Sequence, residues 1–195
     1  MNLIVKEIFY SLQGEGGRQG EASIFIRLSG CNLACSFCDT DFKGGETLNA
    51  GELIEHIRPY PCKWIIWTGG EPTLQLTEEI ISFFHQEGYL QAIESNGHNP
   101  LSKLLDYTVV SPKGEVSYAK GINPEVDEIR LPIQAGEDIP SVSILPRAKY
   151  YFLSPIFIDG DSTKTKENID YCVNYIKEHT EWKLSLQIHK LIGIE

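Results

Sequence analysis

The spacing of apolar residues predicts a chain that alternates between strands and helices. Apolar runs, and alternating apolar and polar positions, are typical of strands and occur at 6–12, 22–29, 64–67, 90–95, 107–111, 128–133, 149–154 and 182–188. Apolar residues three or four positions apart predict helices after Asn49, after Thr77, near 101–105 and over 164–179. Asn49 and Thr77 favour helix N-termini, because their side chains accept hydrogen bonds from first-turn amides.

This alternation predicts an α/β fold. Strands joined through helices form βαβ units, in which neighbouring strands run parallel. About six to seven mostly parallel strands are too few for an eight-stranded barrel, which usually needs ~250 residues. We therefore expect a partial (incomplete) TIM-like β/α barrel, with a doubly wound sheet as the alternative. A single domain is expected to span residues 1–195.

Polar and glycine-rich segments follow several of the expected strands. In either architecture, functional sites lie at the carboxyl ends of parallel strands, and these ends share one edge of the sheet. The segments are SGCNLACSFC at 29–38, TGGEP at 68–72, ESNG at 94–97, SPK at 111–113 and QIHK at 187–190. The sequence therefore predicts one active site at this edge.

The charge balance excludes several kinds of partner. The chain has 195 residues, with 17 Lys and Arg against 27 Asp and Glu, which gives a net charge of −10. Such a chain does not capture nucleic acid or an anionic membrane electrostatically. Its apolar runs are too short to span a bilayer. The first residues include Glu7 and no cleavage site of small residues, so we expect no signal peptide and a cytoplasmic location.

The cysteines divide into a cluster and two isolated residues. Cys31, Cys35 and Cys38 fall within eight residues, a spacing that favours metal binding over a disulfide in a cytoplasmic protein. Structural zinc usually takes two cysteine pairs, and no second pair follows. We therefore favour an iron–sulfur cluster with one iron left open, and zinc remains the alternative. Cys172 lies on the apolar face of an expected helix, and it and Cys62 are expected in the core.

The glycine-rich segments do not fit the common phosphate-binding patterns. The chain has no Gly-Lys-Ser/Thr, and Gln19 stands where a dinucleotide fingerprint needs its third glycine. In TGGEP, Gly69 and Gly70 allow the backbone to approach a ligand closely, and the carboxylate of Glu71 suits an ammonium group. The alternative is an ordinary strand-end turn closed by Pro72.

Two motifs together resemble those of a known superfamily. The segment CNLACSFC at 31–38 resembles the C-x₃-C-x-aromatic-C loop of radical S-adenosylmethionine (SAM) enzymes, and GGEP at 69–72 resembles their SAM-binding segment. Further matches, over essentially the whole chain, resemble the 7-carboxy-7-deazaguanine synthase family of queuosine precursor biosynthesis. These are FYSLQGEG at 9–16, RLSGC at 27–31, CDT at 38–40, ESNG at 94–97, SPK at 111–113 and QIHK at 187–190.

The resemblance implies three cofactors and a reaction. The cofactors are a [4Fe–4S] cluster, SAM and Mg²⁺. Reductive cleavage of SAM gives a 5′-deoxyadenosyl radical, which takes a hydrogen atom from C6 of 6-carboxy-5,6,7,8-tetrahydropterin. The substrate then rearranges with ring contraction and loses ammonia, giving 7-carboxy-7-deazaguanine. The cofactor carries out the difficult chemistry, and the protein positions and shields it.

The resemblance also implies the residues of the site. The cluster ligands are Cys31, Cys35 and Cys38, and Thr40 is the Mg²⁺ ligand. The SAM contacts are Phe37, Cys38, Asp39, Gly70, Glu71, Glu94, Ser111, Pro112 and Lys113. The substrate contacts are Leu12, Gln13, Gly14, Glu15, Arg27, Thr68, His189 and Lys190.

Some of these residues have a role that their chemistry explains. Arg27 is a forked donor that suits the substrate carboxylate, and Glu15 orients Arg27 or the substrate. Glu71 and the neighbouring glycine contact the SAM amino group, and Glu94 bonds the ribose. His189 and the following lysine contact the pterin or its carboxylate.

Expected partners are a small-molecule pterin, an electron donor such as flavodoxin or ferredoxin, and a second copy in a homodimer. Nucleic acid and membrane are not expected. The chain departs from the family pattern at 153–155, where Leu-Ser-Pro replaces a Gln-Pro pair, and at its last residues, where some members end in proline. Two other readings are an activase that installs a glycyl radical on a protein, and a zinc-stabilised or electron-transfer module.

Overall fold

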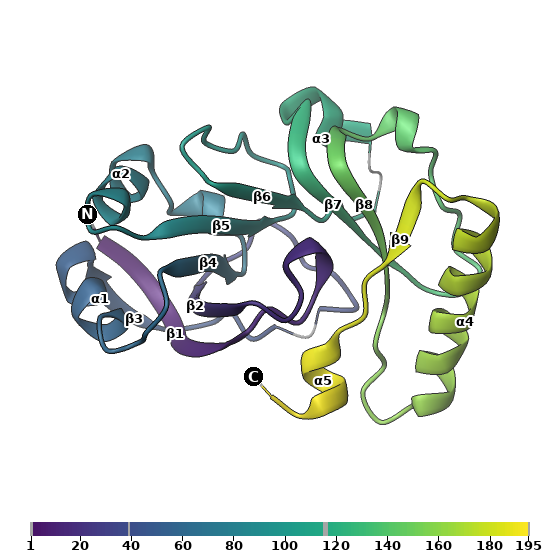
Figure 1. The fold of residues 1–195 in the computed structure, drawn as a ribbon, viewed down its shortest axis with the longest axis horizontal. Helices are drawn as coiled ribbons and strands as arrows, with labels where there is room; N and C mark the ends of the chain where they lie inside the picture. Colours follow the sequence, from purple (N-terminus) through teal and green to yellow (C-terminus); the bar gives the residue numbers. More distant parts are fainter. Residues whose placement is uncertain (1, 39, 115–116, 195) are drawn as a thin grey trace.

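The computed structural model describes residues 2–38, 40–114 and 117–194, and its strands form one curved sheet (Figure 1). The nine strands lie in the order β3-β1-β2-β4-β5-β6-β7-β8-β9. Their bounds are β1 Asn2–Leu12, β2 Ala22–Leu28, β3 Glu46–Asn49, β4 Trp64–Gly69, β5 Leu90–Ser95, β6 Tyr107–Val110, β7 Glu125–Ile133, β8 Arg147–Pro155 and β9 Trp182–Leu184. The strands β2 and β4 to β9 pair in parallel, whereas β1 pairs antiparallel with both β2 and β3.

The expected α/β class and open, partial barrel are confirmed, because the parallel strands form a sheet that does not close. The expected six to seven strands match the parallel part. The sequence pattern missed β3, which pairs with the first residues of β1. None of the helices in the described residues is long and apolar enough to cross a membrane.

In the part of the chain that the structure describes, five α-helices lie around the sheet, at α1 Ala50–Ile57, α2 Glu78–Gln86, α3 Ser117–Ile122, α4 Ser162–Glu178 and α5 Ile188–Ile192. Both expected N-caps are present. Asn49 accepts hydrogen bonds from the amides of Gly51 and Glu52, and the Glu52 side chain bonds back to the Asn49 amide, forming a capping box. The Thr77 hydroxyl accepts from the amide of Ile80. These caps fix where α1 and α2 begin.

Two expected elements differ from the structure. No helix forms near 101–105, because the Ser102 hydroxyl accepts a hydrogen bond from the amide of Leu104 and competes with helical bonding. The last strand ends at Leu184 rather than continuing to 188. Beyond it, the amide of Ile188 donates to the Gly14 carbonyl at 3.1 Å, and the chain leaves the sheet and enters α5.

Two apolar cores fix the sheet from its two ends. One packs α1 and α2 on the strands from β1 to β5, and it contains Cys62 and Trp67. The other packs α4 on the strands from β7 to β9, and it contains Cys172 and Trp182. The prediction that the two isolated cysteines are core residues is therefore confirmed.

The turn between β1 and β2 closes the open side of the barrel. It contains a single 3₁₀ turn at Gly16–Arg18 and lies beside β9 and α5 (Figure 1). The Gly16 amide donates to the Ser185 hydroxyl at 2.9 Å, and the Gly17 amide donates to the Glu128 carboxylate at 2.9 Å. Gly16 has φ +69°, and a Cβ there would lie 2.0 Å from a Glu128 oxygen, so only glycine fits. We call the contact of this turn with 185–189 the seam.

Candidate active site

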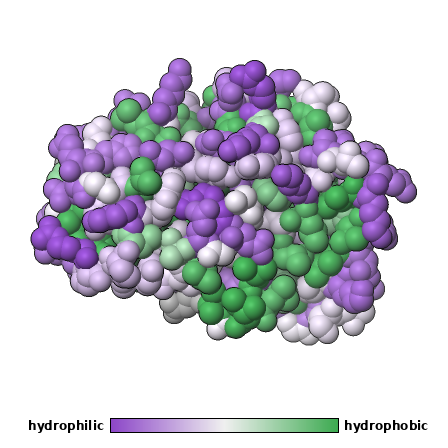
Figure 2. Space-filling model, viewed as in Figure 1, coloured by the Kyte–Doolittle hydropathy of each residue, from purple (hydrophilic) through white to green (hydrophobic). Residues whose placement is uncertain are grey.

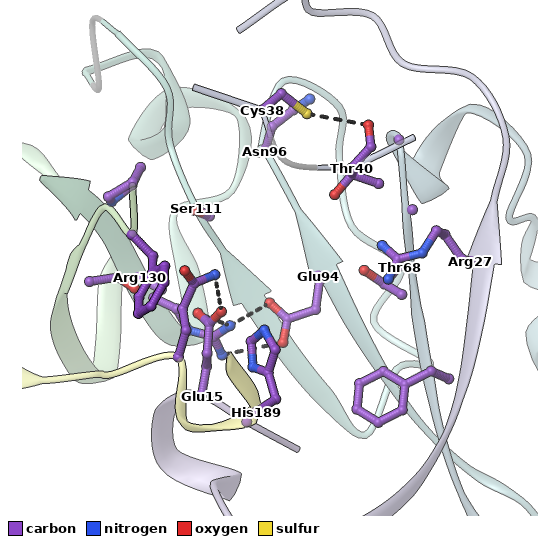
Figure 3. A pocket seen from close by; sticks show the side chains of 18 of the residues that line it. Glu15, Arg27, Cys38, Thr40, Thr68, Glu94, Asn96, Ser111, Arg130 and His189 are labelled. Carbon is purple, nitrogen blue, oxygen red and sulfur yellow. Dashed lines mark hydrogen bonds and ion pairs between the residues drawn. The ribbon is translucent and has the colours of Figure 1, made fainter. Parts of the chain in front are cut away.

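A cavity of about 770 Å³ lies at the carboxyl ends of the parallel strands and is bordered by the β1–β2 turn and α5 (Figure 3). All five polar or glycine-rich segments contribute to its wall, which confirms the expected convergence. The predicted site residues that line it are Leu12, Gln13, Gly14, Glu15, Arg27, Cys31, Cys35, Phe37, Cys38, Thr40, Thr68, Gly70, Glu94, Ser111, Lys113, His189 and Lys190. Pro112 and Glu71 do not line it, and Asp39 lies outside the described residues.

The two glycines after β4 hold the cysteine loop against the sheet. The Gly70 amide donates to the Leu28 carbonyl at 3.0 Å, and the next amide donates to the Gly30 carbonyl at 2.9 Å. A Cβ on Gly70 would lie 1.9 Å from the Gly30 oxygen, and one on Gly69 would lie 2.1 Å from the Leu28 oxygen. The glycines thus permit close backbone contact between β4 and the start of the cysteine loop.

The three clustered thiols share the cavity wall. Burial raises the pKa of Cys35, and the nearby charge of Lys113 opposes this rise. The thiols of Cys31 and Cys38 raise the same pKa further, so the three thiols interact electrostatically. Among the described residues, no three His, Cys, Asp or Glu side chains converge on one metal ion. Three thiols on one loop are soft ligands of the kind that hold an iron–sulfur cluster, in which each cysteine binds a different iron.

Lys113 places a positive charge beside the thiols. Its ammonium donates to the Ser111 hydroxyl at 2.6 Å and lies 5.8 Å from the centre of the Phe37 ring. Burial lowers the pKa of Lys113, and the nearby thiol of Cys35 and the carboxylate of Glu15 oppose that effect. A cation here favours ionised thiols, which are the form that binds iron.

The Glu71 carboxylate, a predicted SAM contact, is held by the protein itself in this geometry. The side chain is fully buried, and its oxygens accept hydrogen bonds from the Thr73 amide at 3.1 Å, the Thr73 hydroxyl at 2.6 Å, the Ser95 hydroxyl at 2.9 Å and the Asn96 amide at 2.7 Å. The contact of this carboxylate with the SAM ammonium group stays a prediction. Glu71 instead fastens the turn after β4 to the end of β5, and Gly70 remains on the cavity wall.

Arg27 and Thr68 lie side by side, since they are register partners in the parallel pair β2–β4. Arg27 donates to the Glu7 carboxylate and lies 5.9 Å from the ring centre of Phe9. Of the two roles expected for Glu15, orienting Arg27 does not occur, because Glu7 pairs with this arginine; orienting the substrate stays a prediction. Thr40, the expected magnesium ligand, lines the same part of the cavity, and its carbonyl lies 3.8 Å from the Cys38 sulfur.

Sequence reasoning missed a buried arginine on β7. Arg130 contacts the carboxylates of Glu15 at 3.2 Å and Glu94 at 3.0 Å (Figure 3), and it contacts the buried carboxylate of Glu128 at 2.7 Å. Burial raises the pKa of Glu94 to about 7, although Arg130 opposes the shift. The signal was present in the sequence, because Glu128 and Arg130 are two charges on one face of a strand whose neighbours are apolar.

The seam brings the second predicted substrate-binding segment, 187–190, to the cavity. His189 packs on Gly14 so closely that a Cβ on the glycine would lie 2.1 Å from the His189 Nδ1 atom. Gln187 donates to the Glu15 carboxylate at 3.0 Å. Lys190 lies 5.3 Å from the ring centre of Phe157, which also lines the cavity. This side of the cavity is also lined by Ser154 and Pro155, where the sequence departs from the family pattern. Ile194, near the end of the chain, lines it as well.

Known proteins are similar to this chain in sequence and in fold. Residues 25–180 match the radical SAM superfamily. Over 190 residues the chain is 40% identical to the 7-carboxy-7-deazaguanine synthase of Bacteroides thetaiotaomicron, with 97% of each chain covered. Over 203 residues it is 38% identical to that of Haemophilus influenzae, covering 100% of this chain and 95% of the relative. The crystal structure of QueE from Escherichia coli has a TM-score of 0.75 at 24% identity, with 95% and 94% of the two chains covered.

The open parallel sheet and the cysteine loop define a radical SAM enzyme. Within that superfamily, the chain belongs to the family of 7-carboxy-7-deazaguanine synthases. A [4Fe–4S] cluster, SAM and Mg²⁺ are the cofactors of this family, as the sequence resemblance implied. The three thiols and Thr40 on one cavity wall are a donor set that fits the cluster and the hard Mg²⁺ ion.

Proposed function

We propose that the cavity converts 6-carboxy-5,6,7,8-tetrahydropterin to 7-carboxy-7-deazaguanine and ammonia. The observation that carries this proposal is that one cavity joins the three thiols to Arg27 and Thr68. The cluster and SAM supply reductive cleavage of SAM and removal of a hydrogen atom from the substrate. The remaining work is positioning, and it belongs to the residues of this chain.

On the substrate side, Arg27 binds the pterin carboxylate through its free guanidinium edge, because Glu7 is paired at Nε. Thr68 contacts the same ligand, and Thr40 offers its hydroxyl to Mg²⁺. The β1–β2 turn, from Leu12 to Glu15, and the α5 residues His189 and Lys190 cover the ring. Their place in the cavity wall supports these roles.

On the SAM side, Gly70 leaves room for the amino acid portion, and Glu94 faces the ribose. Ser111 and Lys113 contact the rest of the molecule, and Phe37 flanks it beside Cys38. Asp39 belongs to the same proposal on the resemblance alone. Pro112 is buried behind the wall, where it fixes the backbone between Ser111 and Lys113. The cavity volume of about 770 Å³ supports binding of SAM together with a small molecule.

We further propose a single radical SAM domain over 1–195, an electron donor such as flavodoxin or ferredoxin, a homodimer, and a cytoplasmic location. Phe37 and Cys38 are exposed, which supports access of a donor to the cluster loop. On α5, Leu191 and Ile192 are 54% and 59% exposed, in an apolar area visible in Figure 2, which supports association of two copies. Sedimentation of wild type against Leu191→Glu tests the dimer, and the variant is expected to be monomeric.

Anaerobic reconstitution tests the reaction. Reduced enzyme with SAM is expected to form 5′-deoxyadenosine, and addition of the carboxytetrahydropterin with Mg²⁺ is expected to form the deazaguanine and ammonia. Failure to cleave SAM would remove both this proposal and the activase alternative. Cleavage without a deazaguanine product, together with a glycyl radical on a partner protein, would favour the activase.

A further inference from the structure

Arg130 lies between the two halves of the cavity. It comes from the middle of β7, is 7% exposed, and meets carboxylates from three separate segments. Its Nη1 donates to Glu15 at 3.2 Å and to Glu94 at 3.0 Å, and its Nη2 donates to Glu94 at 3.2 Å. Glu15 is on the β1–β2 turn and Glu94 is on β5. One guanidinium therefore spans the two sides to which the pterin and SAM are assigned.

A buried anchor fixes the orientation of this arginine. Glu128 is fully buried and accepts from Arg130 at Nε and Nη2, at 2.9 and 2.7 Å. The same carboxylate accepts from the Tyr107 hydroxyl and the Gly17 amide, each at 2.9 Å. Because Glu128 accepts four hydrogen bonds, it holds the planar guanidinium of Arg130 in one orientation. The guanidinium edge that faces away from Glu128 is left for the cavity carboxylates.

A second link closes a ring of hydrogen bonds. The Gln13 amide group donates to Glu94 at 3.0 Å, and its oxygen accepts from the Glu15 backbone amide at 3.1 Å. The ring runs through Glu15, Arg130, Glu94 and Gln13. A change in the position of Glu94 therefore reaches Glu15 by two routes, through the guanidinium and through the β1–β2 turn.

We propose that Arg130 is a positioning residue that couples the two ligand sites, so that SAM and the pterin each raise the affinity of the enzyme for the other. The inference rests on the proposed function, which assigns Glu94 to SAM and Glu15 to the pterin side. A ligand that fixes Glu94 also fixes Arg130 and Glu15, so the second ligand meets carboxylates that are already ordered. By linkage, the coupling factor is the same in both directions.

The test measures binding rather than turnover. Cluster-loaded enzyme without a reductant binds SAM and does not cleave it, so anaerobic calorimetry gives the Kd for SAM with and without saturating carboxytetrahydropterin and Mg²⁺. For wild type we expect the ratio of the two Kd values to be about fivefold or more. Arg130→Lys keeps the charge and loses the fork, and its ratio is expected to be near one. Arg147→Lys is the matched control, since Arg147 pairs with Glu125 on the exposed surface.

A second variant covers the case in which Arg130→Lys does not fold. Glu15→Gln leaves the buried Arg130–Glu128 pair intact and weakens the contacts of the β1–β2 turn with Arg130 and Gln187, so its ratio is expected to fall at least twofold below wild type. A wild-type ratio of one would overturn the inference, as would variants that keep the wild-type ratio. Product formation by wild type is measured separately: product with a ratio of one overturns only the coupling, and coupling without product overturns only the proposed reaction.

Discussion

Replacing Glu94 with glutamine is expected to remove a pH dependence of folding stability that the buried carboxyl creates. Burial, only partly opposed by Arg130, raises the pKa of Glu94 from 4.5 to about 7. In the unfolded chain the carboxyl ionises at its ordinary value, so the folded protein binds the proton more tightly. The stability from this proton is fully present below about pH 4.5 and is lost as pH rises through 7.

The size of the effect follows from the shift. A shift from 4.5 to about 7, at 1.36 kcal/mol per pKa unit, gives a loss of about 3 kcal/mol in the free energy of unfolding between acidic and mildly basic pH. For a chain of this length that corresponds to a change in Tm of roughly 10 °C. Glutamine cannot ionise, so the Glu94→Gln variant does not lose this stability. As pH rises, its free energy of unfolding is therefore expected to increase relative to that of wild type by this amount.

Urea unfolding of the cluster-free protein, followed by tryptophan fluorescence at several pH values from 5 to 8, measures that difference. Other titrating groups are common to both proteins and cancel. A difference that stays constant over this range, to within ~0.5 kcal/mol, would refute the reasoning, because it would mean that Arg130 keeps the Glu94 carboxylate charged despite its burial.

Three further substitutions test the cluster wall. Cys35→Ala is expected to abolish SAM cleavage and to lower iron content, whereas Cys172→Ala, in the core, keeps both; cleavage retained in the first variant would contradict the cluster assignment. Gly70→Ala forces a methyl group into the backbone of the cysteine loop and is expected to reduce reconstituted cluster absorbance severalfold, with Gly121→Ala, in open space, as the control. Thr40→Ala is expected to raise the Mg²⁺ concentration needed for half-maximal product formation about tenfold and to leave iron content unchanged; equal Mg²⁺ requirements would exclude this ligand.

Local sequence signals predicted where two helices begin, which residues lie in the core, and which edge of the sheet carries the site. The caps at Asn49 and Thr77, and the core position of Cys172, follow from hydrogen bonding and periodicity within a few residues of each position. The convergence of the site segments follows from the parallel sheet, because all carboxyl ends of parallel strands lie at one edge. These predictions needed only local patterns and the order of elements along the chain.

The features that the sequence pattern missed depended on partners distant in sequence. For Glu71, the pattern shows the charge but not the four hydrogen bonds that its oxygens accept within the protein. Glu15 was expected beside Arg27, yet it pairs with Arg130, 115 positions away. The strand expected up to 188 ends early because the chain turns to meet Gly14. Periodicity cannot foresee contacts made by a turn at the opposite edge of the sheet.

The seam makes completion of the site a late event in folding. The hydrogen bond from Gly16 to Ser185 joins residues 169 positions apart in the sequence. The neighbouring hydrogen bond from Ile188 to Gly14 has a similar sequence separation. Contacts of such sequence separation carry a large loop-closure cost and form slowly. During synthesis the cysteine loop therefore emerges long before residues 185–189, and the cavity wall opposite the thiols is the last part of the site to be made.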